Sequence, residues 1–125
     1  MPLINGIGKG WALRYLREAK AELTAAQKIP YMASSLILEA VKKAQAAVYH
    51  SLGDPASAEA IVYLTMLKKQ SQEEPVLRCL VEIELMVQQI AMASELEREK
   101  ALEQAGELIQ IASDIVKLFV GEKVD

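Results

Sequence analysis

Three glycines and a lysine stand together in NGIGKGW, residues 5–11, and these are the residue types of a phosphate-binding loop. Such a loop works because a strand feeds it and the backbone N–H groups of the following helix converge on the phosphate. Only five residues precede Gly6, too few for a packed strand, and no Ser or Thr follows Lys9 as a metal ligand. The stretch is therefore interpreted as a flexible leader over residues 1–8 that feeds a helix.

The basic residues are the next candidates for chemistry, because they are unevenly distributed. Residues 1–50 contain seven Lys and Arg against three Glu, although the whole chain has a net charge of −3. This half is predicted to bind an anion, such as RNA, a nucleotide or an acidic protein partner, through Arg14, Arg17, Lys42, Lys43 and His50. The alternative is ordinary solvated helix faces, with His50 placed to stabilise a helix carboxyl end.

Catalytic and metal-binding patterns are scarce in this sequence. A single His and a single Cys cannot supply a nucleophile–base pair, and no glutamate lies three residues before His50 as a di-iron helix requires. Glu99, Glu103 and Glu107 share a helix face but lack a matching acidic row elsewhere, so we expect a solvated face. The sequence predicts no catalytic residue, no metal and no cofactor.

Hydrophobic periodicity predicts the helices that must carry these residues. Apolar residues recur at spacings of three and four along nearly the whole chain, which is typical of amphipathic helices. Expected helices cover residues 9–28, 30–52, 55–70, 76–93 and 95–120. Helix starts are indicated by Pro30, by Asp54 before Pro55 and by a capping box at Ser94, and a helix end by Gly53.

These elements predict one all-α domain over residues 1–125, an antiparallel four- to five-helix up-and-down bundle. In the third helix, Ile61, Leu64 and Leu67 are expected to face inward. The helices over 76–93 and 95–120 carry two adjacent apolar stripes each, more than one buried face needs. We therefore expect a homodimer with one of these two helices at the interface, unless the bundle itself encloses them.

The expected location is the cytoplasm. No apolar run approaches the roughly 20 residues that a membrane span needs, and no signal peptide is recognised. The lone Cys79 fits a reducing compartment.

Three segments resemble HEPN-like helical domains, with the closest similarity to the archaeal repeat-family branch. They are WALRYLREAKAELTAAQ, IPYMASSLILEAVKKAQAAVYHSLG and the closing AGELIQIASDIVKLFVGE, about two-thirds of the chain. The positions that carry the resemblance in the second segment are Tyr31, Ala33, Ser34, Ala40, Lys42, Lys43 and Ala44. The resemblance implies a four- or five-helix antiparallel bundle, commonly dimeric, in a prokaryotic cytoplasm.

Active members of that group cut RNA with an Arg followed a few residues later by a His. No Arg stands at that distance before His50, and no His follows Arg78. The resemblance therefore implies a non-catalytic protein that binds nucleotide or RNA, or that serves as a partner subunit. The alternatives are a homo-oligomeric interaction module and, behind it, a tetratricopeptide-like adaptor. Tyr31, Ser34, Leu38 and Val41 match the spacing of an adaptor helix, but three or more repeats are normally needed.

Overall fold

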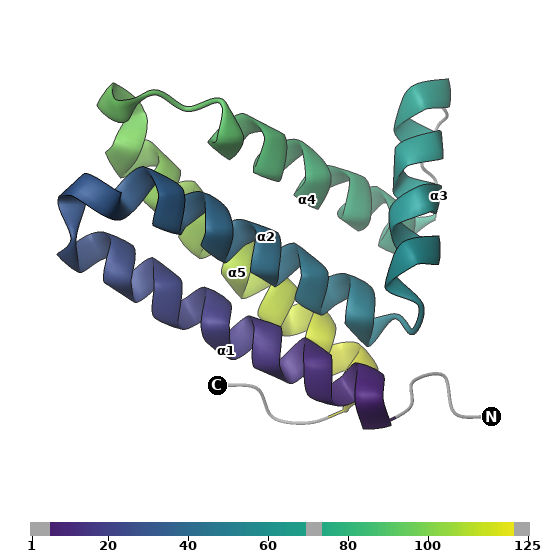
Figure 1. The fold of residues 1–125 in the computed structure, drawn as a ribbon. Helices are drawn as coiled ribbons and strands as arrows, with labels where there is room; N and C mark the ends of the chain where they lie inside the picture. Colours follow the sequence, from purple (N-terminus) through teal and green to yellow (C-terminus); the bar gives the residue numbers. More distant parts are fainter. Residues whose placement is uncertain (1–5, 70–73, 122–125) are drawn as a thin grey trace.

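The computed structural model describes residues 6–69 and 74–121, which contain five α-helices and no strand (Figure 1). The helices are α1 (Gly6–Lys28), α2 (Ala33–Ser51), α3 (Pro55–Lys68), α4 (Pro75–Ala91) and α5 (Arg98–Val120). One-turn 3-10 helices, η1 (Pro30–Met32) and η2 (Glu95–Glu97), precede α2 and α5. The all-helical prediction is confirmed. Figure 1 shows α1, α2, α4 and α5 running up and down beside one another, whereas α3 crosses one end of the others steeply.

Local capping explains where these helices begin and end. The carboxylate of Asp54 accepts a hydrogen bond from the backbone N–H of Ala56 at 3.1 Å, and Pro55 opens α3 with a suitable fixed φ. At the start of η2, the carboxylate of Glu97 accepts from the backbone N–H of Ser94 at 3.0 Å. Gly53, just after α2, has a φ of 113°, which favours glycine. The predicted start and stop signals at these positions are confirmed.

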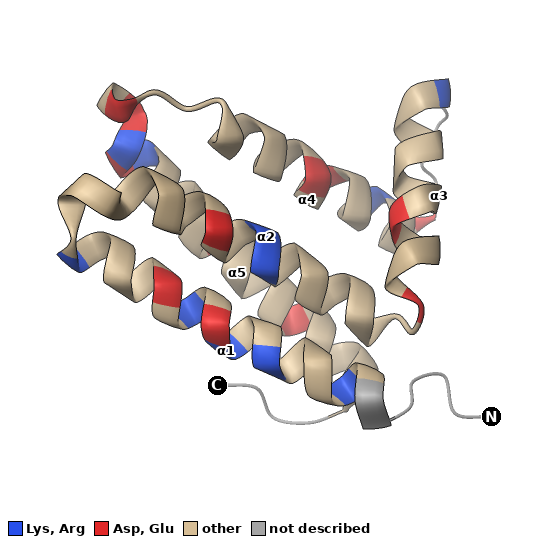
Figure 2. Cartoon of the chain, viewed as in Figure 1, with Lys and Arg blue, Asp and Glu red and all other residues tan. Residues whose placement is uncertain are grey.

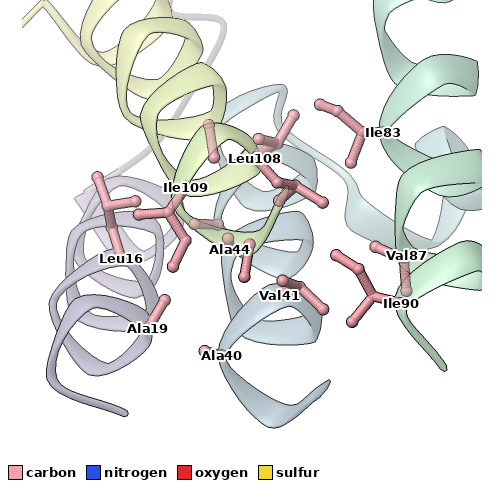
Figure 3. Close-up of a cluster of buried hydrophobic side chains, with 14 of the residues drawn as sticks. Leu16, Ala19, Ala40, Val41, Ala44, Ile83, Val87, Ile90, Leu108 and Ile109 are labelled. Atoms are coloured by element: carbon pink, nitrogen blue, oxygen red, sulfur yellow. The ribbon is translucent and has the colours of Figure 1, made fainter. Parts of the chain in front are cut away.

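The core is built around α2, which contacts each of the other four α-helices. Where α1, α2 and α5 meet, the buried residues are mostly alanines, and small side chains let helix axes approach closely. The buried alanines are Ala12, Ala19, Ala26, Ala33, Ala40, Ala44, Ala47, Ala101, Ala105 and Ala112. Leu16 and Leu108 fill the remaining space, and α4 adds larger side chains such as Ile83 and Ile90 (Figure 3).

The broad apolar faces of α4 and α5 are largely buried in this core. On α5, Ile109 and Val116 are buried, and on α4 Val81 is buried, whereas Leu85 is exposed. The bundle thus encloses most of the surface that had suggested an interface on these two helices. The homodimer itself stays a prediction, but its interface is no longer expected there.

Two details of the helices differ from the sequence prediction. Helix α1 begins at Gly6, so residues 6–8 of the expected leader are helical, while residues 1–5 lie outside the described part of the chain. The predicted inward face of α3 is wrong. Ile61, Leu64 and Leu67 are 53%, 47% and 64% exposed, whereas Val62 and Thr65 are buried.

The sequence of α3 explains the wrong face. Apolar residues surround this helix almost completely, so periodicity alone does not select the buried side. The hydroxyl of Thr65 donates to the backbone carbonyl of Ile61 at 2.7 Å, which satisfies the polar group and lets Thr65 face the core. As a result, the more apolar side of α3 faces away from the bundle.

Adjacent substitutions in α3 test this orientation. We expect Val62→Ala to lower the free energy of unfolding by about 2 kcal/mol, because two buried methyl groups are lost and a cavity remains. The control, Ile61→Ala, should change it by less than about 0.5 kcal/mol, since the side chain is exposed. Urea denaturation followed by circular dichroism measures both. A larger loss of unfolding free energy for Ile61→Ala than for Val62→Ala would instead show that the face predicted from the sequence is the buried one.

Candidate functional site

The structure separates the five residues predicted to bind an anion. Arg14 and Arg17 lie on α1, and Lys42, Lys43 and His50 lie on the antiparallel helix α2. Figure 2 shows acidic and basic segments side by side along both helices. Arg17 and Lys42 are exposed and make no ion pair with any described residue, whereas Lys43 and Arg14 are paired with carboxylates.

Lys43 is surrounded by carboxylates from two helices. Its Nζ lies 2.7 Å from Glu22 Oε2, 3.1 Å from Glu18 Oε1 and 3.3 Å from Glu39 Oε1. The hydrogen bond with Glu22 is the largest cause that raises the pKa of Lys43 far above its usual range. Arg14 Nε donates to Glu18 Oε2 at 3.0 Å, so the cluster carries three carboxylates and two cations. A phosphate would have to displace these partners, which removes Lys43 from the predicted anion site.

The pair of Glu39 and Lys43 could be predicted from their spacing of four residues on one helix. Glu18 and Glu22 could not, because they lie on α1 and reach Lys43 only after the two helices pack. Sequence reasoning therefore missed the two carboxylates that neutralise the predicted site.

Glu22 and Glu39 differ in how readily they ionise. Burial raises the pKa of Glu22, whose Oε1 atom is buried without a hydrogen-bond partner among the described residues. The pKa of Glu39 is lowered, first by its hydrogen bond with Glu22 and then by the hydrogen bond with Lys43. Glu22 is thus the member of this pair that takes up a proton first as the pH falls.

An aromatic cluster does bring two of the predicted residues together. The ring centroids of Trp11 and Tyr15 are 5.4 Å apart, and the His50 ring lies 5.4 Å from Tyr15 and 6.3 Å from Trp11. The Arg14 guanidinium lies 5.1 Å from the centre of the Trp11 ring, a cation–π distance. Trp11 is 39% exposed, so part of its ring surface is open to a ligand. The spacing of Trp11, Arg14 and Tyr15 on one helix was a signal that the sequence reasoning did not use.

A groove of about 580 Å³ lies between α3 and α4, with the end of α2 at its floor. Helix α3 forms one wall with Ala56, Ala60, Tyr63, Leu67 and the charged Glu59, and the polar residues Glu84 and Gln88 of α4 form the other. The volume is within the range of about 300–1,000 Å³ that is usual for ligand sites. Because the α3 wall is largely apolar and both walls carry a carboxylate, the groove suits an apolar side chain or helix better than a phosphate.

Tyr49 closes the floor of the groove and is 6% exposed. Gln45 Nε2 donates to its hydroxyl at 3.2 Å and to Glu84 Oε1 at 2.7 Å. Burial, with the nearby carboxylates of Glu84 and Glu59, raises the pKa of Tyr49 to about 12. The tyrosine therefore stays protonated at neutral pH, and its O–H has no acceptor among the described residues.

The described residues contain no group of three or more His, Cys, Asp or Glu side chains that could hold a metal ion. Burial raises the pKa of the half-buried Cys79 thiol, which lowers its reactivity as a nucleophile. Glu99, Glu103 and Glu107 are all exposed on α5. In the described part of the chain, none of the helices has the length and apolar character required to cross a bilayer.

Comparison with known proteins supplies no relative: the chain matches no protein-family model, no curated protein and no solved structure. Its function must therefore be argued from the groove, the aromatic cluster and the charges described above.

The Lys43 cluster generates a prediction with a defined pH dependence. Lys43→Met should lower Tm by about 5 °C at pH 7, because three carboxylates lose their shared cation. The lowered pKa of Glu18 and of Glu39 stabilises the native protein at neutral pH, and this contribution is lost as the pH falls through the carboxyl range. The gap in Tm between wild type and variant should therefore narrow between pH 7 and pH 4. Lys42→Met, beside it and unpaired among the described residues, is the control; a gap that widened in acid would contradict the account.

Proposed function

We propose that this protein is a non-catalytic interaction module that docks a helix of a partner subunit against the outward face of α3. The observation that carries the proposal is the exposure of large apolar side chains on that single helix. Four of them, Ile61, Tyr63, Leu64 and Leu67, are between 47% and 65% exposed. Two are also part of the α3 wall of the groove described above.

The arrangement of these residues suits a helix as the docked element. Ala60, Tyr63, Leu64 and Leu67 follow the i, i+3, i+4, i+7 spacing that anchors one helix on another. Soluble monomers rarely expose a contiguous apolar patch of more than a few hundred Å². Helix α3 buries only Val62 and Thr65 fully against its own bundle, which leaves its larger apolar side chains exposed.

This proposal keeps the partner-subunit role that the HEPN-like resemblance implies. Membership of that group stays a prediction from the sequence, supported by the three helical segments on which it was based. A non-catalytic role is supported by the single His and single Cys of the chain. The cytoplasm stays the expected location.

Substitutions on α3 test the proposed docking. We expect Tyr63→Glu and Leu67→Glu to abolish the retention of binding partners, including further copies of the chain, because a carboxylate in an apolar contact loses its hydration. The measurement is quantitative affinity capture in the presence of nuclease. Leu96→Glu is the matched control, since Leu96 is 98% exposed and lies on η2, away from α3. Retention that survives both α3 substitutions, with native circular dichroism, would contradict the proposal.

A second candidate function is supported by the aromatic cluster. Single-stranded RNA and nucleotides bind proteins by stacking bases on aromatic rings beside cations, and Trp11, Tyr15, His50 and Arg14 provide both. Arg17 and Lys42, unpaired among the described residues, would contact phosphates. This candidate ranks second because two of the four predicted Arg and Lys residues are paired with carboxylates.

Trp11 is the only tryptophan, so its fluorescence reports directly on stacking. If RNA binds here, a single-stranded oligonucleotide should quench the emission. Its affinity should fall about tenfold between roughly 50 and 200 mM salt if two or three phosphates are contacted. Lys42→Glu should weaken binding further, whereas Lys100→Glu on α5 should not. Emission that stays constant at high RNA concentration would exclude stacking on Trp11.

A further inference from the structure

We infer that the helix docked on α3 is the α3 of a second copy, paired antiparallel about a two-fold axis. The inference rests on the proposed docking function and specifies its occupant. It moves the expected homodimer interface from α4 or α5 to α3. Three observations support the inference: the residue sizes along the α3 wall of the groove, the charges at the two ends of α3 and the exposure of Tyr63 and Leu67.

Four of the seven α3 residues that line the groove have a spacing that is the same in both directions. Ala56, Ala60, Tyr63 and Leu67 are separated by four, three and four residues. An antiparallel copy can therefore be aligned so that each of these four positions lies opposite one of the same four positions in the other copy. In this register Ala56 lies opposite Leu67 of the second copy, and Ala60 lies opposite its Tyr63.

The sizes of the side chains match in this register. Within these four positions each large residue faces an alanine and each alanine faces a large residue, which favours close approach of the two helices. All four residues line the groove, and the two large ones are among the most exposed apolar side chains of the helix. A parallel copy would instead place Tyr63 against Tyr63 and alanine against alanine, which fills space poorly.

The charges at the two ends of α3 also favour the antiparallel orientation. Asp54 caps its amino end, and Lys68 and Lys69 lie at its carboxyl end (Figure 2). In the register above, Lys69 of one copy is level with Asp54 of the other, so opposite charges and opposite helix-dipole ends are brought together. A parallel pair would bring the four lysines together. Exposed charges add little affinity, but they select between the two orientations.

Access to this surface is open in the fold. Figure 1 shows α3 crossing the end of the bundle, and Tyr63 and Leu67 on its groove side are 65% and 64% exposed. Pairing about a two-fold axis beside α3 buries the same surface on both copies, so the assembly is a closed dimer.

Paired cysteines test the register directly in the full chain, with Cys79→Ala as the background. Positions 56 and 67 are eleven residues apart on one helix, or about 16 Å, so they cannot form a disulfide within a chain. In the antiparallel register, position 56 meets position 67 of the second copy, while each position is about 16 Å from its own equivalent. We expect Ala56→Cys/Leu67→Cys to form a covalent dimer on mild oxidation, and each single variant to stay uncrosslinked. An equimolar mixture of the two single variants should give the cross-linked pair.

Light scattering on the wild-type chain gives an independent result that does not depend on the cysteines. We expect a mass of twice 13.8 kDa at tens of micromolar, returning to 13.8 kDa with Tyr63→Glu. Cross-linking of the single variants would show a parallel pair, and a dimer that survives Tyr63→Glu would show another interface; either overturns the inference. A monomer whose capture of a different protein still depends on Tyr63 and Leu67 overturns the second copy as occupant but leaves the proposed docking function standing.

Discussion

The close packing of α1 and α5 on α2 is the constraint on which the rest of this structure depends. Alanines occupy most of the contacts among these three helices, so the axes approach closely and α2 becomes the centre of the core. Helix α4 then covers the remaining side of α2 with larger aliphatic residues (Figure 3). Once these four helices enclose one another, only the end of the bundle is left for α3. Its short contact there buries one narrow side of an almost wholly apolar helix and leaves the other side exposed.

The same packing determines which of the basic residues are paired with carboxylates. Bringing α1 against α2 places Glu18 and Glu22 beside Lys43, so a cation with one carboxylate partner in its own helix gains two more in the fold. The cluster has a structural role, because it joins the outer edges of two helices whose inner faces are alanines. The groups that stay accessible to a ligand on these two helices include the aromatic cluster of Trp11, Tyr15 and His50 with the Arg14 guanidinium.

The sequence predicts most of the fold because its local signals agree with one another. Proline, glycine and capping residues place the helix ends within three residues of their positions in the structure, and four of the five helices have a clear apolar stripe. Helix α3 lacks such a stripe, because its apolar residues surround the helix axis. The hydroxyl of Thr65 also donates a hydrogen bond to a backbone carbonyl of its own helix, so this polar residue can be buried. The candidate sites were harder to predict. The Lys43 cluster and the groove each join residues from different helices, and no spacing along the chain encodes such contacts.

Concentration-dependent hydrogen exchange of α3 tests the central claim most directly, because it reports on this helix within the intact protein. The account predicts that amides of α3 exchange rapidly in dilute protein, and that their protection rises from nanomolar to tens of micromolar concentration. Protection of α2, which is enclosed within the monomer, should stay constant over the same range. Protection of α3 that already equals that of α2 in dilute protein and does not change with concentration would contradict the claim that the outward face of α3 is a docking surface for a second copy.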